Sequence, residues 1–190
     1  MVQPWVGAGY ECWTVDVQHP PGIWRDGLVV KVGADVRSWF PVLNPAIVFA
    51  FPPCTNLAVS GARWFQDKGL EALRESLDLV IACKGICEAS DAPWMLENPV
   101  GTLSTYWRKP DYTFQPWQYG DRYSKKTCLW TGGGFVMPKE WHATPPDGTT
   151  AAIHLMPPSA DRADKRSVTP AGFARAVFEA NEPRVRERVA

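Results

Sequence analysis

The sequence lacks an apolar run of 18 residues or more, and its first residues lack the charged segment and apolar stretch of a secretory signal. Membrane insertion and secretion are therefore not expected. An excess of one charge is also absent, because 20 Lys and Arg balance 20 Asp and Glu. Proteins that bind nucleic acid are usually more basic, so any such contact must come from a local patch.

A disulfide framework and a metal-ligand pattern are likewise absent. The five cysteines are an odd number without framework spacing, which favours a reduced, cytoplasmic setting. Cys83 and Cys87 stand four residues apart, but no second pair and no histidine has matching spacing. We therefore expect these two cysteines to pack in the core, and we predict no metal site.

The composition is that of a globular protein of one domain. The chain has 190 residues, of which 45% are hydrophobic and 21% are charged. Ten tryptophans and 18 prolines are unusual and indicate rigid loops lined by aromatic rings. Within this single domain we expect a core at 1–103, an aromatic and basic loop region at 104–150, and a connector with a C-terminal helix at 151–190.

The hydrophobic pattern predicts an α/β fold. Residues 11–17 alternate like a strand, and 28–32 favour a second, short strand. The continuous apolar run at 46–51 is typical of a central parallel strand that is buried on both faces. Apolar residues at helical spacing predict a long helix at 66–89, which leads into a strand at 93–99. Strand, helix and strand in this order form a βαβ unit with parallel strands.

Fewer elements are expected in the second half of the chain. Two strands are predicted near 128–131 and 134–136, within a region rich in turns. A helix is expected from about 170 to 180, with Thr169 as its N-cap. Residues 157–167 would form an exposed connector.

Three of the predicted strands end in polar or reactive side chains. These are Asp16, Cys54 and Glu97. In an open parallel sheet, ligands bind outside the carboxyl ends of the strands. Because Cys54 and Glu97 follow two strands that one helix joins, we expect them to face a shared crevice.

A cysteine beside a carboxyl group suits chemistry at carbon 5 of cytosine. That carbon is a poor nucleophile until another group adds to carbon 6, and a thiolate such as that of Cys54 can add there. An acid that protonates or hydrogen-bonds ring nitrogen 3 makes the addition easier, which is the role expected of Glu97. Pro52 and Pro53 would hold the cysteine in a rigid loop.

Five features, in the same order along the chain, resemble the cytosine-5 DNA methyltransferase family. FPPCTNLAVSG at 51–61 is similar to the family's Pro-Cys loop, and ENP at 97–99 to its Glu-Asn-Val motif. RSVTPAGFARA at 166–176 resembles the Arg-x-Leu-Thr-Pro-Arg-Glu motif. Asp16 and Asp35 stand where the family places acids against the ribose and the adenine amino group of its cofactor.

The resemblance implies a Rossmann-like methyltransferase fold, with a mostly parallel sheet that is flanked by helices and truncated at its first strand. It implies S-adenosylmethionine as cofactor and a flipped DNA cytosine as substrate, with Cys54 as nucleophile and Glu97 as its partner. The remaining site residues that it implies are Pro52 toward the cofactor, and Pro53, Ser60, Asn98, Lys125 and Lys126 toward the substrate.

Parts of the family's pattern are missing. The Phe-x-Gly-x-Gly loop has no counterpart, because MVQPWVGAGYE resembles the helix after that loop, and Gly7 and Gly9 favour a turn that ends a helix. GDRYSKKTCLW at 120–130 replaces the Gln-Arg-Arg motif, and the target-recognition domain and final Asn-rich motif are absent. Either the true start lies upstream of Met1, or cofactor binding is degraded. Compact relatives of this kind occur in bacteriophages, which would place the protein in the host cytoplasm.

Residues 104–126 combine cations with aromatic rings. The cations are Arg108, Lys109, Arg122, Lys125 and Lys126. The rings are those of Tyr106, Trp107, Tyr112, Phe114, Trp117, Tyr119 and Tyr123. Cations for phosphates and flat rings for unstacked bases favour a nucleic-acid groove, whereas the alternative is a well-packed loop with a solvated rim.

Other interpretations of the site residues stay open. Cys54 could be a small buried side chain, and Glu97 could cap a helix at 100–105. Asp16 and Asp35 could simply end strands and start turns. For the function, the alternatives are the same chemistry on a free nucleotide or on single-stranded nucleic acid, and a DNA-binding protein without catalysis.

Overall fold

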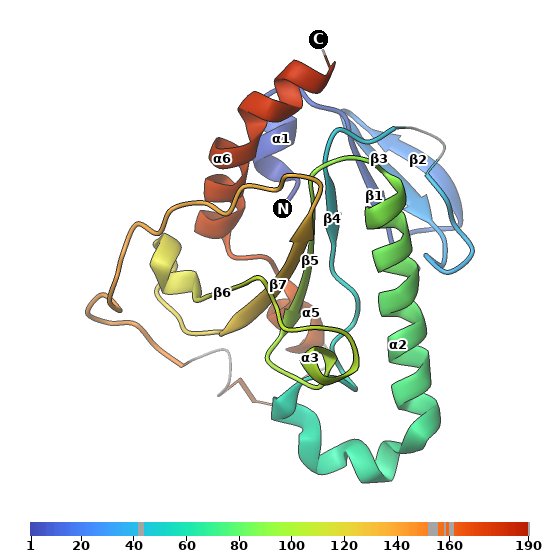
Figure 1. Ribbon diagram of the computed structural model, residues 1–190, viewed down its shortest axis with the longest axis vertical. Helices are drawn as coiled ribbons and strands as arrows, with labels where there is room; N and C mark the ends of the chain where they lie inside the picture. Colours follow the sequence, from blue (N-terminus) through green and yellow to red (C-terminus); the bar gives the residue numbers. More distant parts are fainter. Residues whose placement is uncertain (42–43, 152–155, 158, 160–161, 190) are drawn as a thin grey trace.

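A computed structural model of the protein describes residues 1–41, 44–151, 156–157, 159 and 162–189 (Figure 1). It is a mixed α/β structure with two separate sheets. The smaller sheet has the order β1-β3-β2, and the larger one has the order β4-β5-β7-β6. Each sheet contains one parallel pair, β1 with β3 and β4 with β5, and its other pairs are antiparallel.

The small sheet is built from short strands near the N-terminus. After helix α1 (Gln3–Gly7), strand β1 (Cys12–Val15) pairs in parallel with β3 (Val29–Gly33). Strand β2 (Gly22–Asp26) forms an antiparallel hairpin with β3 across a turn at Gly27, whose φ is 59°. This sheet carries the predicted strands 11–17 and 28–32, and the turn at Gly9 ends α1 as expected.

The predicted βαβ unit forms the centre of the larger sheet. Strand β4 (Val48–Ala50) leads through the 3-10 helix η1 (Val59–Trp64) into helix α2 (Phe65–Ala89), and β5 (Trp94–Pro99) follows. Helix α2 packs against both strands, so the predicted strand–helix–strand unit is confirmed (Figure 1). Gly69 interrupts the regular helix with φ 73° and ψ −178°.

Strand β5 is buried on both faces, and its alternating side chains belong to two hydrophobic clusters. Trp94 and Leu96 pack with α2 in one cluster, whereas Met95 packs in the other with Phe173 of helix α6 (Ala171–Val189). Cys83 and Cys87 belong to the α2 cluster, as predicted for core residues. Burial raises their pKa values to about 11 and about 12 respectively.

The rest of the larger sheet comes from the aromatic region. Helix α3 (Leu103–Tyr106) is followed by strand β6 (Tyr112–Phe114), the 3-10 helix η2 (Pro116–Tyr119) and strand β7 (Thr127–Gly132). Strand β7 runs antiparallel to β5 and confirms the strand predicted at 128–131.

Several expectations are wrong. The sheet is neither single nor mostly parallel, and the structure supports a mixed α/β arrangement without establishing a Rossmann-like order. Residues 134–136 form no strand, since Gly133 and Gly134 have positive φ values and turn the chain out of β7. The predicted connector 157–167 lies partly outside the described residues, and Arg162–Ser167 form helix α5. Helix α6 also runs well beyond residue 180.

Within the described residues, no helix combines the length and apolar character needed to cross a membrane.

Candidate active site

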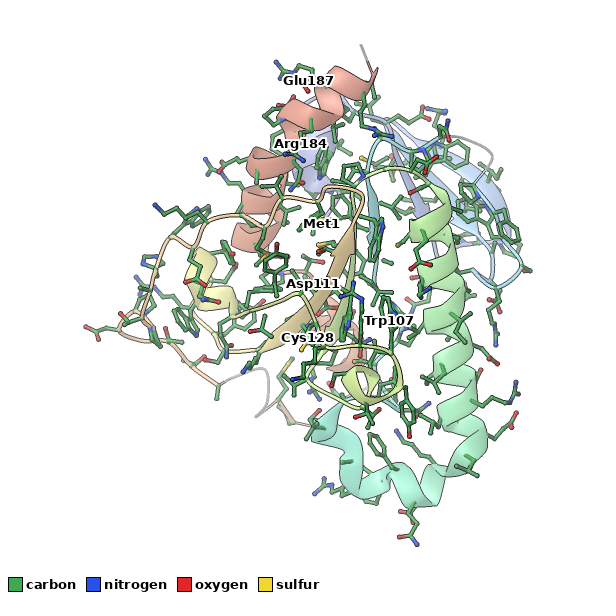
Figure 2. The ribbon with its side chains drawn as sticks, in the orientation of Figure 1. Met1, Trp107, Asp111, Cys128, Arg184 and Glu187 are labelled. Carbon is green, nitrogen blue, oxygen red and sulfur yellow. The ribbon has the colours of Figure 1, made fainter. Side chains whose placement is uncertain are left out.

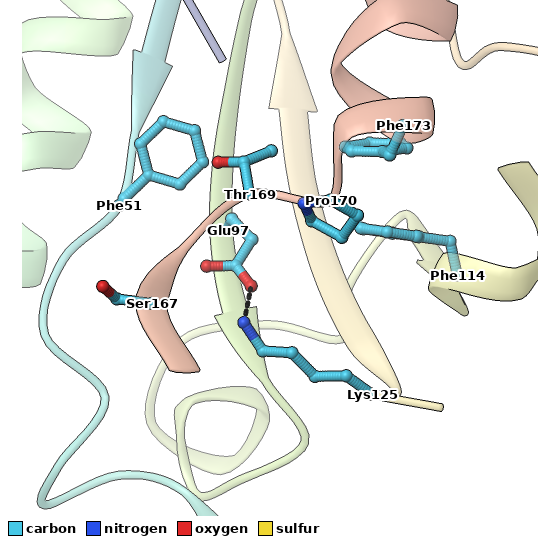
Figure 3. Close-up of a pocket in the computed structure, with 8 residues that line it drawn as sticks. All are labelled: Phe51, Glu97, Phe114, Lys125, Ser167, Thr169, Pro170 and Phe173. Carbon is cyan, nitrogen blue, oxygen red and sulfur yellow. Dashed lines mark ion pairs between the residues drawn. The ribbon is translucent and has the colours of Figure 1, made fainter. Parts of the chain in front are cut away.

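The two parallel strands β4 and β5 carry the candidate residues to one edge of the larger sheet. Ala50, the last residue of β4, pairs with Leu96 of β5, so Phe51 and Glu97 follow side by side. Figure 3 shows these two side chains facing the same pocket. Cys54 lies three residues beyond Phe51 and is half-buried. The βαβ geometry therefore brings the cysteine loop and the carboxyl group to the same sheet edge, as the sequence predicts.

The loop that carries Cys54 is held by hydrogen bonds from three directions. The fully buried Asn98 donates from Nδ2 to the carbonyl oxygen of Pro52, over 3.1 Å. The carbonyl oxygen of Cys54 accepts from the backbone N–H groups of Leu57 and Ala58, over 3.0 and 2.9 Å. The backbone N–H of Thr102 donates to Leu57 O over 2.8 Å. These hydrogen bonds fix the turn that carries the Cys54 thiol.

Gly101 makes the last of these contacts sterically feasible. A Cβ atom at this position would lie 2.1 Å from the carbonyl oxygen of Leu57. Only glycine lets the chain after β5 approach the cysteine loop so closely. The Glu-Asn-Pro motif and the residues after it therefore position the loop as well as the carboxyl group.

Lys125 joins Glu97 from the segment before β7. Its Nζ atom lies 3.9 Å from Glu97 Oε1 (Figure 3). The same atom donates to the backbone carbonyl of Arg166 over 2.8 Å. The side chains of Lys125 and Glu97 are only 15% and 18% exposed. This long ion pair links β5 to the segment that leads into α6.

A small cavity lies at this ion pair. The residues that line it are Phe51, Glu97, Phe114, Lys125, Ser167, Thr169, Pro170 and Phe173. Its volume of about 10 Å³ accommodates roughly one water molecule. A pyrimidine ring enters only if the surrounding side chains move apart, and Cys54 does not line the cavity in this conformation.

Burial sets the proton affinities of both candidate residues. It raises the pKa of Glu97, and the nearby charge of Lys125 partly opposes the shift. Burial also raises the pKa of the Cys54 thiol, and so does the charge of Glu97, whereas Lys125 and Arg166 lower it. The four groups thus lie within electrostatic range of one another. Glu97 is disposed to hold a proton, and Cys54 rests as a thiol.

The two aspartates predicted for the cofactor lie at the carboxyl ends of β1 and β3, in the small sheet. Asp16 is exposed, and its Oδ1 accepts from the backbone N–H of Gln18 over 2.8 Å. Asp35 forms an ion pair with Arg37, which lowers the pKa of the Asp35 carboxyl group. Neither aspartate lines the cavity beside Glu97.

The remaining predicted site residues differ in accessibility. Pro53, Ser60 and Lys126 are exposed, whereas Pro52 is buried. Asn98 is completely buried, so the contact that the structure gives it is with the loop. Glu97 does not cap the following helix, because α3 has Thr102 at its N-cap and no side-chain capping bond.

The rings in 104–126 are divided between the interior and the surface. Phe114 and Tyr119 are buried in the cluster with Phe173, whereas Tyr106 and Tyr112 are 55% and 40% exposed. Trp107 lies toward α2 and stacks on Trp130 (Figure 2), with ring centroids 5.8 Å apart. The buried and stacked rings agree with the alternative of a well-packed loop, and the two exposed tyrosines do not.

Sequence reasoning missed the part that Arg166 plays. It contributes a backbone acceptor to Lys125 and a charge that lowers the pKa of Cys54. Its position in the RSVTP motif was a sequence signal, but nothing in that motif indicates a contact with a lysine 41 residues away.

We predict that Asn98→Ala weakens both the fold and the active-site loop. Removing the buried amide leaves Pro52 O without its donor, at an expected cost of about 1–3 kcal/mol of unfolding free energy. Chemical denaturation would measure this loss. Asn181→Ala is the matched control, since Asn181 is equally buried but binds Val136, away from the loop. Both variants should lose stability, and only Asn98→Ala should lower kcat for a folded sample. Equal kcat values would contradict the positioning role.

The fold and site together define a mixed α/β protein with a cysteine and a buried carboxyl group at neighbouring strand ends. No protein-family model matches the chain, and no curated protein matches it.

Proposed function

We propose that this protein methylates carbon 5 of a cytosine base in DNA, with S-adenosylmethionine as methyl donor. The observation that carries the proposal is the arrangement of Cys54 and Glu97. They follow two adjacent parallel strands and so lie at the same edge of the larger sheet. Cysteine addition next to a protonated carboxyl group is what activation of carbon 5 requires.

The proposed reaction begins with loss of the Cys54 proton and formation of a bond between sulfur and carbon 6. The electrons of the carbon 5–carbon 6 double bond shift toward nitrogen 3, where Glu97 donates its proton. Burial raises the pKa of Glu97, which favours the protonated form that this step requires. The positive charges of Lys125 and Arg166 favour the thiolate. After carbon 5 is methylated, nitrogen 3 returns its proton to Glu97, the carbon 5 proton passes to water, and the bond between sulfur and carbon 6 breaks. Cys54 leaves as a thiolate and regains from water the proton that it lost at the start.

The base must enter beside the ion pair of Glu97 and Lys125. That pair is long, at 3.9 Å, and Lys125 keeps a second partner in the carbonyl of Arg166. We therefore propose that the ring of the base displaces Lys125 from Glu97 while the lysine stays anchored to the segment before α6. Moving the base out of its stack and into this position costs roughly a few kcal/mol of free energy.

For the cofactor, Asp16 and Asp35 fit the adenosine half. Both carboxylates lie at the carboxyl ends of adjacent parallel strands. Asp16 retains acceptor sites beyond its one side-chain hydrogen bond, whereas all four hydrogen bonds that the Asp35 carboxylate accepts come from Arg37, whose side chain would have to turn away from it. When bound, S-adenosylmethionine would supply an electrophilic methyl group, with its ribose at Asp16 and its adenine at Asp35.

Covalent trapping tests the function directly. An oligonucleotide with 5-fluorocytosine has no carbon 5 proton to lose, so the methylated adduct should remain attached to the protein. We expect intact mass spectrometry to show one adduct, only when S-adenosylmethionine is present, and peptide mapping to place it on Cys54. An adduct on Cys12 or Cys128, or no adduct with the 5-fluorocytosine oligonucleotide in either single-stranded or duplex form, would overturn the proposal.

A further inference from the structure

A second, larger cavity lies on the same loop as Cys54. It has a volume of about 360 Å³ and opens between the first turns of α2 and helix α3. This volume is within the range typical of sites for small organic ligands. The cavity begins at Asn56, two residues after Cys54, so the Cα atoms of the two residues are at most about 7 Å apart. Lys68, which also lines the cavity, donates to Thr55 O over 2.9 Å.

The break in α2 shapes this cavity. Gly69 lines it and has φ 73°, a conformation that redirects the first turn of the helix away from the rest. No atom lies within 4 Å of the place where a Cβ of Gly69 would be. The glycine is therefore required by the backbone conformation and not by a tight contact.

The lining combines rings with hydrogen-bonding groups. Phe65 and Tyr106 provide aromatic surfaces, and Tyr106 is 55% exposed. Gln66 and Thr102 provide polar groups. Asn56 uses its Nδ2 for Ala72 O and Ser76 Oγ, which leaves its carbonyl oxygen as an acceptor. Flat rings with a few amide and hydroxyl groups match the two faces and the polar edge of a nucleobase.

The residues just before Phe65 add a cation and a further ring. Trp64, at the end of η1, is 51% exposed, and the Arg63 guanidinium lies 5.0 Å from its ring centre. Lys68 brings positive charge to Thr55, the residue after Cys54, as binding of a phosphate backbone requires. Exposed rings and cations are thus found near the cysteine loop, and one of these rings, Tyr106, belongs to the aromatic region 104–126.

We propose that this cavity binds the unstacked base next to the target cytosine, and that the substrate is therefore single-stranded DNA. The inference rests on the proposed function, because it takes the cytosine to lie at Cys54. In a duplex the neighbouring base stays stacked and paired, so it cannot enter a pocket between Phe65 and Tyr106. In a single strand the same base is already free to leave its stack.

Binding measurements on the Cys54→Ala protein test this without any need for methyl transfer. Fluorescence anisotropy would compare a single-stranded oligonucleotide that has one cytosine with versions that carry an abasic site on either side of it. Stacking in the cavity predicts that one of the two abasic sites weakens binding by about 5- to 150-fold. The duplex and free dCMP are expected to bind more weakly than the intact single strand.

A double-mutant cycle assigns that loss to the cavity. In Tyr106→Ala the effect of the abasic site should largely disappear, whereas Tyr112→Ala, an exposed tyrosine on β6, should keep it. An unchanged abasic effect in Tyr106→Ala, no abasic effect at all, or duplex binding as tight as single-strand binding would overturn the inference. If the protein is trapped at Cys54 but the abasic sites have no effect on binding, only the proposal of base binding in the cavity is refuted. If an abasic site weakens binding but no protein is trapped, only the proposed methylation is refuted.

Discussion

Replacing Cys54 by alanine is expected to lower methyl transfer by about 10⁴-fold or more, because the covalent route to an activated carbon 5 is lost. Incorporation of a labelled methyl group into a cytosine-containing oligonucleotide would measure this. The other groups of the site remain in place, so any residual rate reflects binding and Glu97 alone. Serine at this position should be almost as inactive, since its hydroxyl is far harder to ionise than a thiol.

The fold should survive this change. Cys54 is half-buried on a turn that is held by its backbone, so the loss of one sulfur atom should alter the unfolding free energy by no more than about 1 kcal/mol. Cys83→Ala is the matched control, since Cys83 is also half-buried but packs against the hydrophobic core. It should keep its methylation rate at temperatures at which it is folded. If Cys54→Ala methylated at the rate of this control, the nucleophile would have to be another group.

The βαβ unit could be predicted because its signals are local. The apolar runs before Pro52 and Pro99 and the helical spacing between them are written in consecutive residues, and they place Cys54 and Glu97 at one sheet edge. Strand β2 gave no such signal, since all five of its residues are exposed and no burial pattern marks them. The direction of β7 was also hidden, because a continuous apolar strand looks the same in parallel and antiparallel pairing.

The partners of the site depend on contacts that are distant in sequence. Lys125 reaches Glu97 only because β7 pairs with β5 in antiparallel register, and Arg166 reaches Lys125 through the segment before α6. In the aromatic region 104–126, by contrast, a local signal was misleading. The composition of this region suggested a binding surface, but composition does not state which rings face inward. Phe114 stacks on Phe173 at 3.8 Å between ring centroids, inside the core.

Replacing Glu97 by glutamine is expected to lower methyl transfer by about 10²- to 10⁴-fold, because the amide cannot pass a proton to nitrogen 3. The pH profile should change as well. In the wild type the rate rises as Cys54 ionises and falls as Glu97 loses its proton. In the variant the falling limb should vanish, because glutamine does not titrate. The rate of the variant should then follow ionisation of the Cys54 thiol alone, up to the raised pKa of that thiol. An unchanged profile would exclude Glu97 as the acid.

The same substitution should stabilise the fold at high pH. Burial raises the pKa of Glu97 in the folded protein, so the folded state holds this proton more tightly than the unfolded state. The stability that this provides is present below the ordinary pKa of a glutamate and is lost as the pH rises through the folded value. The melting temperature of Glu97→Gln should therefore exceed that of the wild type increasingly above about pH 4.5 and differ little below it.

An exposed glutamate provides the control with the opposite sign. Arg74 lowers the pKa of Glu71 in the folded protein, so Glu71→Gln should lose a little stability as the pH rises instead of gaining it. A difference between Glu97→Gln and the wild type that stayed constant from pH 4 to pH 9 would mean that Glu97 titrates normally. If Glu97→Gln raises the melting temperature above about pH 4.5 and also lowers the rate of methyl transfer, the buried carboxyl group is retained for its chemistry and not for its packing.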